Sequence, residues 1–194
     1  LLPIERLAQE GERLSVNGLT LRVIVASGHS PAGLCLYCEE EGFLITGDAL
    51  WAGDVSPIAP SVEGALAALN ATISLDKLEQ LGAHTLYPGH GEMTDDVPAN
   101  FRRVREKLDR LMSDPKKLAW HSFKQIFLFT LLMKDGISEA ALLPYLQSVP
   151  WFPDYCRTYL DLEQANALDR LLDELERKRL ASLEDGVWRA LMPR

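Results

Sequence analysis

Short apolar runs recur along the first half of the chain, and three of them lead into a glycine followed by a side chain that can bind a metal. The runs end in Ser27-Gly28-His29, Thr46-Gly47-Asp48 and Pro88-Gly89-His90. Apolar runs of four to eight residues fit buried strands, and a glycine lets the backbone turn sharply or approach a bound group closely. The pattern therefore predicts that two imidazoles and one carboxylate lie along one edge of a sheet.

The remaining pattern of the first half predicts further strands and two helices. Asn17-Gly18 is a strong hairpin signal between strands at residues 12–16 and 19–26, and residues 34–38 form the next strand. A long helix is expected from an N-cap at Ser61 to about residue 81, with Val62, Leu66, Leu69 and Ile73 as its apolar stripe. A second helix is expected at residues 98–112.

Asp114-Pro115 indicates a domain boundary, because a helix seldom continues through the residue before a proline. Beyond it we expect helices near residues 120–134, 138–148 and 161–179, then strands at 180–183 and 187–191 joined by an Asp-Gly turn. Three helices followed by a hairpin outline a winged helix. Trp120, Phe123, Phe127, Trp151 and Phe152 are expected to form the core of this domain.

Composition limits the function classes. The 194 residues carry a net charge of −8, which argues against broad binding to nucleic acid phosphates. No apolar run is long enough to span a membrane. The three cysteines do not suggest a disulfide framework, so we expect a reducing, cytoplasmic compartment.

His29, Asp48 and His90 are the candidate metal ligands, because a mixture of nitrogen and oxygen donors suits zinc, iron or manganese. Each motif alone is more often an ordinary turn, but their joint occurrence after three strands favours a metal site. His84 and His121 are interpreted as structural. Cys35 and Cys38, three residues apart on one strand, point to opposite faces and are interpreted as core residues rather than zinc ligands.

The three motifs resemble those of the metallo-β-lactamase-fold hydrolases, including the glyoxalase II and beta-lactamase-like protein 2 groups. The matching stretches are Ser27–Gly33, Thr46–Leu50 and Tyr87–Gly91. The resemblance implies an α/β fold, with residues 1–113 as the C-terminal part of an αββα sandwich and residues 114–194 as a small winged-helix-like α+β tail. It also implies that His29 binds one metal, His90 binds the other, and Asp48 bridges the two.

The chain departs from the family at one motif. His-x-His-x-Asp-His, which lies upstream in the family and supplies most of the ligands, does not occur among the four histidines of this sequence, and the chain opens on Leu1 rather than methionine. We therefore expect the C-terminal part of a longer protein. It could supply at most three ligands. We expect two divalent metals, zinc foremost, in the complete protein, and the case in which this chain alone binds none stays open.

The resemblance implies hydrolysis by a metal-bridging hydroxide, with Asp48 as the catalytic carboxylate and a small thioester or ester as the substrate. The alternatives are a phosphodiesterase or endoribonuclease of the same superfamily, or a catalytically inactive interaction fragment. The acidic third helix of the tail disfavours nucleic acid, so the tail is interpreted as a lid or interaction module. Half of a sandwich would also expose the apolar face of its sheet, which predicts a homodimer, strand exchange or poor solubility.

Overall fold

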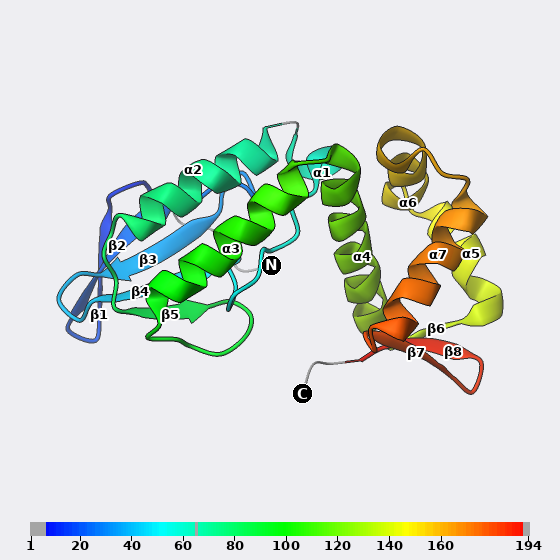
Figure 1. Ribbon diagram of the computed structural model, residues 1–194. Coiled ribbons are helices and arrows are strands. Elements are labelled where there is room, and N and C mark those ends of the chain that lie inside the picture. Colours follow the sequence, from blue (N-terminus) through cyan, green and yellow to red (C-terminus); the bar gives the residue numbers. More distant parts are fainter. Residues whose placement is uncertain (1–6, 65, 192–194) are drawn as a thin grey trace. The chain divides into compact units, whose positions relative to one another are not determined.

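The first of two units, Leu1–Met112, is built on a five-stranded sheet. The strand order is β1 (Arg13–Val16), β2 (Leu19–Val25), β3 (Leu34–Cys38), β4 (Phe43–Gly47) and β5 (Thr85–Pro88). Strands β1 to β4 pair antiparallel, whereas β5 pairs parallel to β4. Strands β2, β4 and β5 therefore run in one direction, and their C-terminal ends lie at the same end of the sheet (Figure 1).

The computed structural model describes residues 7–64 and 66–191, with the side chains of residues 61 and 62 left out. The chain divides between residues 112 and 113, beside the Asp114-Pro115 dipeptide. Within the described residues no helix is both long and apolar enough to cross a membrane.

The prediction of one long helix at residues 61–81 is wrong, because the helix begins one residue earlier and is interrupted. Two helices occur, α1 (Pro60–Glu63) and α2 (Ala67–Glu79), and Gly64 ends the first with a positive φ of +88°. Ala59, not Ser61, is the N-cap, because Pro60 supplies the fixed φ of the first helical position. Helix α3 (Val97–Met112) follows β5 and matches the expected second helix.

The expected apolar stripe of α2 is also wrong. Leu66, Leu69 and Ile73 are 64%, 50% and 56% exposed, and the side chain of Val62 lies outside the described residues. The buried positions of the helix are Ala67, Ser74, Leu75 and Leu78. The helix is apolar on both sides, so periodicity alone could not tell which side faces the sheet.

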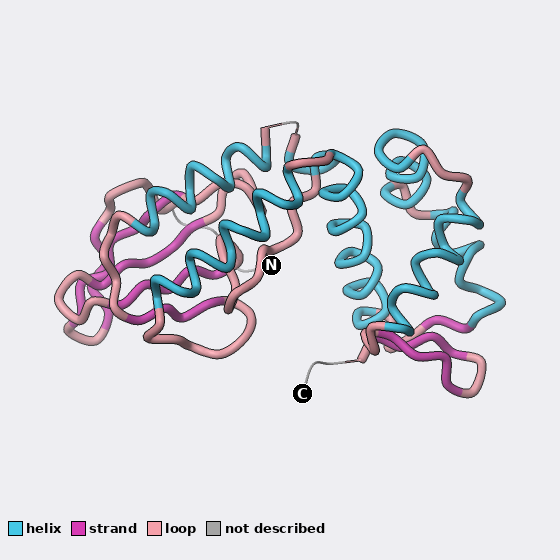
Figure 2. The backbone as a smooth tube through the Cα atoms, in the orientation of Figure 1, coloured by secondary structure: helices cyan, strands magenta, loops and turns pink. Residues whose placement is uncertain are grey.

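Helices α2 and α3 lie side by side across one face of the sheet, where Arg105 of α3 pairs with Asp76 and Glu79 of α2 (Figures 1 and 2). The register places Tyr37, Leu44 and Leu86 in one row, and all three are buried. The next row along the strands faces the opposite side and contains Leu36, Ile45 and Tyr87. Ile45 and Tyr87 are exposed, so this second face carries uncovered apolar side chains.

The second unit, Ser113–Arg194, is mainly helical. It contains α4 (Pro115–Met133), α5 (Glu139–Ser148), α6 (Trp151–Asp154), the π-helix η1 (Tyr155–Leu160) and α7 (Gln164–Arg177). A three-stranded sheet has the order β6 (Ile137–Ser138), β8 (Val187–Ala190) and β7 (Ala181–Glu184). The expected helices and hairpin are therefore present, but the pattern missed β6, α6 and η1.

Aromatic side chains form the core of this unit, as expected. Phe123, Phe127 and Phe152 are fully buried, Trp120 is nearly so, and Trp151 packs against the cluster while partly exposed. The ring of Phe123 stacks on Trp120 and on Phe152, with centroids 5.5 and 5.3 Å away. The helical connection from α5 to α7 contributes Phe152 and Tyr155 to this core, and both are buried.

Candidate metal centre

The side chains of His29, Asp48 and His90 come together at the C-terminal ends of β2, β4 and β5. Nε2 of His29 lies 3.9 Å from Oδ2 of Asp48, and Nε2 of His90 lies 3.6 Å from Oδ1. The two imidazoles thus face different oxygens of one carboxylate. All three side chains are accessible to solvent, at 34% exposure for His29, 43% for Asp48 and 64% for His90.

These distances suit metal coordination better than direct hydrogen bonding. Two ligands about 2.1 Å from one tetrahedral zinc are about 3.4 Å apart. The His90–Asp48 separation of 3.6 Å is near this value, the His29–Asp48 separation of 3.9 Å is longer, and both exceed the length of an N–H···O bond. Each of two ions would receive one imidazole nitrogen and one carboxylate oxygen from this chain. Among the described residues, however, no group of three or more His, Cys, Asp or Glu side chains could hold a metal by itself. The donors have the chemistry of metal ligands, and among the described residues they are too few to complete a coordination shell.

The ring of His29 is oriented by a backbone carbonyl. Its Nδ1 lies 2.7 Å from the carbonyl oxygen of Pro57. A carbonyl can only accept, so Nδ1 carries the proton and the neutral ring keeps its lone pair on Nε2, which faces Asp48. Metal-binding histidines commonly have this arrangement. Sequence gave no signal for the Pro57 carbonyl, because backbone acceptors look alike in a sequence.

Trp51 contacts two of the three candidate ligands. Its indole Nε1 donates to Oδ1 of Asp48 at 2.8 Å. Its ring lies against that of His90, with centroids 4.5 Å apart and an interplanar angle of 55°. Trp51 was not predicted as a site residue, although its position three residues after Asp48 was a signal that could have found it.

The loop that carries Trp51 is fixed by many hydrogen bonds. Asn100 of α3 is buried, and its side chain accepts from the Gly53 amide at 2.5 Å and donates to the Trp51 carbonyl at 3.3 Å. The Ala52 amide donates to the His90 carbonyl at 3.2 Å. The side chain of buried Thr46 donates to the Leu50 carbonyl at 2.8 Å. The segment after β4 is thus tied to α3 and to the loop after β5.

Two of the glycines are required by close packing. A Cβ atom on Gly89 would lie 2.8 Å from the Gly47 carbonyl oxygen and 3.1 Å from Oδ1 of Asp48. A Cβ on Gly28, where φ is +143°, would lie 2.7 Å from the Cα and Cβ atoms of Ala71. The glycines of the first and third motifs therefore let neighbouring backbone approach the loops that carry the histidines.

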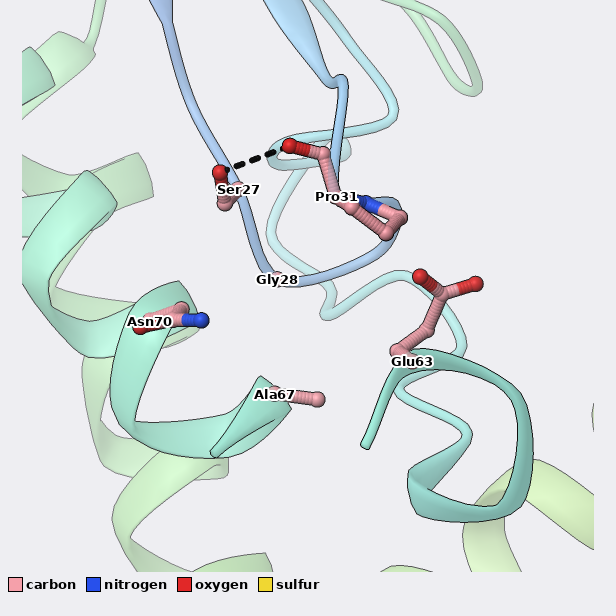
Figure 3. A pocket seen from close by; sticks show the side chains of 6 residues that line it. All are labelled: Ser27, Gly28, Pro31, Glu63, Ala67 and Asn70. Carbon is pink, nitrogen blue, oxygen red and sulfur yellow. Dashed lines mark hydrogen bonds between the residues drawn. The ribbon is translucent and has the colours of Figure 1, made fainter. Parts of the chain in front are cut away.

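A cavity of about 310 Å³ opens beside the candidate ligands, and residues lining it include His29, Asp48, Ser30 and Leu34. A second cavity of about 160 Å³ lies against Ser27 and Gly28 of the same loop. Figure 3 shows that Glu63 and Asn70, from the ends of α1 and α2, line its other side. The loop between β2 and β3, held by the Ser27 Oγ to Pro31 carbonyl bond of 3.0 Å, therefore borders both cavities.

The other candidate residues lie apart from this cluster. His84 precedes β5 beside Gly42, and His121 is buried in α4 of the second unit. Cys35 and Cys38 are both buried and free, and Cys35 donates to the Thr46 carbonyl at 3.3 Å. Burial raises the pKa of the Cys35 thiol to about 12, which makes thiolate coordination of a metal there unfavourable.

Part of the chain matches a known protein family. Residues 2–90 match the family model of the metallo-beta-lactamase superfamily. This range contains all three candidate ligands. The lactamase-like protein vrtG of Penicillium aethiopicum is 28% identical over 160 residues, covering 76% of this chain and 50% of that protein. The atrochrysone carboxyl ACP thioesterase of Aspergillus fumigatus is 28% identical over 108 residues, covering 56% of this chain and 31% of that protein.

Solved structures support the fold. A beta-lactamase domain protein from Burkholderia ambifaria superposes with a TM-score of 0.55 at 21% identity, covering 99% of this chain and 54% of that one. The chain has a mixed α/β structure related to the metallo-beta-lactamase fold. It spans half or less of the length of the two curated relatives described above.

Proposed function

We propose that the chain supplies three ligands to the two-metal centre of a metallo-beta-lactamase-superfamily hydrolase that acts on a small thioester or ester. The observation that carries the proposal is the placement of two imidazole Nε2 atoms against different oxygens of Asp48. A carboxylate between two imidazoles can accept a cation on each oxygen, and this is the arrangement that a bridging ligand requires.

Each residue would have a distinct part in the reaction. His29 and His90 would bind as neutral imidazoles, one at each cation, and Asp48 would hold the cations together and offset part of their charge. The divalent ions, zinc foremost with iron or manganese as alternatives, would supply Lewis acidity and lower the pKa of a bound water. The cavity beside His29 and Asp48 would admit the reacting carbonyl group.

The remaining ligands would come from a segment of a longer protein that carries the His-x-His-x-Asp-His motif. This part of the proposal rests on the histidines at positions 29, 84, 90 and 121, which cannot form such a motif. It also rests on the length of the relatives, of which the chain spans half or less. An interaction fragment without a metal is the competing function, because three ligands alone leave each coordination shell open.

Net charge and the names of relatives support the proposed substrate class. One relative is named an atrochrysone carboxyl ACP thioesterase. The net charge of −8 makes a phosphodiester polymer a poor substrate at physiological salt.

Three buried free cysteines fit a reducing, cytoplasmic compartment.

We propose that the second unit is a winged-helix-like module used for interaction rather than for reading nucleic acid. Its order of α4, β6, α5, α7 and the β7–β8 hairpin, with β8 central in the sheet, supports the winged-helix interpretation. Helix α7 would be the recognition helix, but its sequence QANALDRLLDELER contains more acidic than basic residues. Phosphate backbones repel such a helix.

The exposed sheet face supports self-association of the isolated chain. Leu34, Ile45 and Tyr87 lie on three adjacent strands and are 41%, 37% and 42% exposed. We propose that the 194-residue chain dimerises or exchanges strands through this face. Light scattering should show a dimer or larger species, and the double variant Ile45→Thr and Tyr87→Thr should shift it toward the monomer.

The test of the proposed function is metal content and thioester hydrolysis in the longer protein, purified without chelator. The wild type should bind about two divalent ions and hydrolyse a small acyl thioester. Asp48→Ala should lose at least one ion and nearly all turnover. His84→Ala should keep the wild-type metal content and the wild-type turnover. Unchanged activity in Asp48→Ala, or a wild type without metal, would refute the proposal.

A further inference from the structure

We propose that Trp51 is a positioning residue that fixes Asp48 and His90 in the geometry needed to bind metal. This inference rests on the proposed function, because it assigns Trp51 a part in the same site. One indole makes both contacts. It donates to Oδ1 of Asp48 at 2.8 Å, and it packs on the His90 ring with 4.5 Å between the ring centroids.

The hydrogen bond selects one orientation of the carboxylate. A carboxylate oxygen has two lone pairs, so Oδ1 can accept the indole N–H and still face Nε2 of His90 at 3.6 Å. The bond restrains rotation about the Cβ–Cγ bond of Asp48. Oδ2 then stays directed toward Nε2 of His29. A phenylalanine at position 51 would keep an aromatic surface and lose this control.

The ring contact restrains the second ligand. His90 is 64% exposed and follows a Pro-Gly dipeptide, so its side chain has few neighbours to hold it. The indole of Trp51 supplies a flat surface against the imidazole. The Ala52 amide bonded to the His90 carbonyl fixes the adjacent backbone. Orienting residues of this kind typically affect metal affinity by about 10- to 100-fold.

Trp51 is itself held in place. Asn100 accepts from the Gly53 amide and donates to the Trp51 carbonyl. The Trp51 amide donates to the Asp54 carbonyl at 3.1 Å. A side chain anchored on a rigid loop can impose an orientation on its neighbours at little entropic cost. The tethers make Trp51 a support for the ligands rather than a flexible cover.

The first experiment needs no metal. In the 194-residue chain, the indole ¹H–¹⁵N resonance of Trp51 is assigned from its loss in Trp51→Phe. Asp48→Ala should move that resonance upfield and speed its exchange with solvent. Trp120, which donates to Glu174 at 2.6 Å in the second unit, is the matched control and should not move. A Trp51 resonance unaffected by Asp48→Ala would overturn the inference.

The second experiment measures metal binding in the longer protein by competition for Zn²⁺ and by the visible spectrum of the Co²⁺ form. Trp51→Phe should weaken Zn²⁺ binding about tenfold and alter the Co²⁺ bands, while Trp120→Phe leaves both unchanged. Wild-type affinity and spectrum in Trp51→Phe would overturn the inference. A wild type that binds no metal would refute both the proposed function and the metal-positioning role, whereas the indole resonance would still report whether Trp51 holds Asp48.

Discussion

The side chain of Asn100 donates a hydrogen bond of 3.3 Å to the carbonyl oxygen of Trp51 and joins helix α3 to the loop that follows β4. Its Oδ1 accepts from the Gly53 amide at 2.5 Å, so one buried amide satisfies two backbone groups of that loop. A helix 50 residues away in the sequence thereby sets the position of the segment that begins with Asp48.

Asn100→Ala should destabilise the first unit by about 1–3 kcal/mol, because two partly buried backbone groups would lose the side chain of buried Asn100 as their partner. Trp51 is the only one of the four tryptophans that precedes residue 113. Its indole ¹H–¹⁵N resonance can therefore report the unfolding of this unit in urea. Asn70→Ala is the control. Asn70 is half-buried on α2, and alanine favours a helix, so this change should be neutral or slightly stabilising. Equal midpoints for the two variants would contradict the argument.

Gly89→Ala should perturb the candidate site by steric contact. The new methyl group would meet the Gly47 carbonyl at 2.8 Å and Oδ1 of Asp48 at 3.1 Å, so one of the two loops has to shift. We expect a loss of about 1–3 kcal/mol in unfolding free energy and a changed Trp51 indole resonance. Gly82→Ala is the comparison, since φ there is +67° but the methyl group would meet no neighbour within 4 Å. Backbone strain alone should leave the Trp51 resonance in place.

The two sides of α2 should respond differently to truncation. Leu75 is 3% exposed and Ile73 is 56% exposed. Leu75→Ala should cost about 2–5 kcal/mol because it leaves a cavity against the sheet. Ile73→Ala should change the unfolding free energy by less than about 0.5 kcal/mol. Urea unfolding of the two variants, followed at Trp51, checks the assignment, and a larger loss for Ile73→Ala would reverse it.

The second unit should lose stability in acid through Glu174. Burial raises the pKa of this carboxyl, but hydrogen bonds from Lys124, Lys178 and Trp120 outweigh that effect and lower it from 4.5 to about 2. The folded-state pKa lies below the unfolded value. The stabilisation is therefore complete above about pH 4.5 and is lost as the pH falls toward 2. Its size is on the order of 2–3 kcal/mol.

Glu174→Gln provides the measurement. The stability difference between wild type and variant should be largest near pH 6 and shrink toward pH 2, as followed by urea unfolding of the second unit. Glu184→Gln, on an exposed strand position, is the control and should show no such trend. A difference that stays constant from pH 6 to pH 2 would mean that the Glu174 charge is not the cause.

Much of the first unit could be predicted from the sequence because its signals are local. Asn17-Gly18 marked the hairpin, and the apolar runs before Gly28, Gly47 and Gly89 marked the strands. Strand β3 pairs antiparallel with both β2 and β4, and β5 pairs parallel with β4. Strands β2, β4 and β5 therefore run in the same direction. This topology brings His29, Asp48 and His90 to the same end of the sheet, although their binding of a metal remains a prediction.

The errors fall where two local signals competed. At Pro60 the fixed φ of proline defined the helix start, and Ser61 became part of the helix. In α2, Leu66, Leu69 and Ile73 formed the more regular apolar pattern, yet the side bearing Leu75 and Leu78 was buried. In the second unit, the stretch between the expected helices at 138–148 and 161–179 had no predicted element, yet it forms α6 and η1, and its aromatic side chains pack in the core.

The sequence by itself determined which residues could bind a metal, in which order they occur, and that each follows a strand and a glycine. Only the tertiary structure decided how they are oriented. The carbonyl of Pro57 accepts from Nδ1 of His29 and so places the ring proton there. The indole of Trp51 orients the carboxylate of Asp48, and Asn100 of α3 holds the backbone of Trp51. The His29–Pro57 and Asn100–Trp51 contacts join residues 28 and 49 positions apart, and hydrogen bonds to backbone groups leave no periodicity in a sequence. Their geometry exists only once the sheet and α3 have packed together.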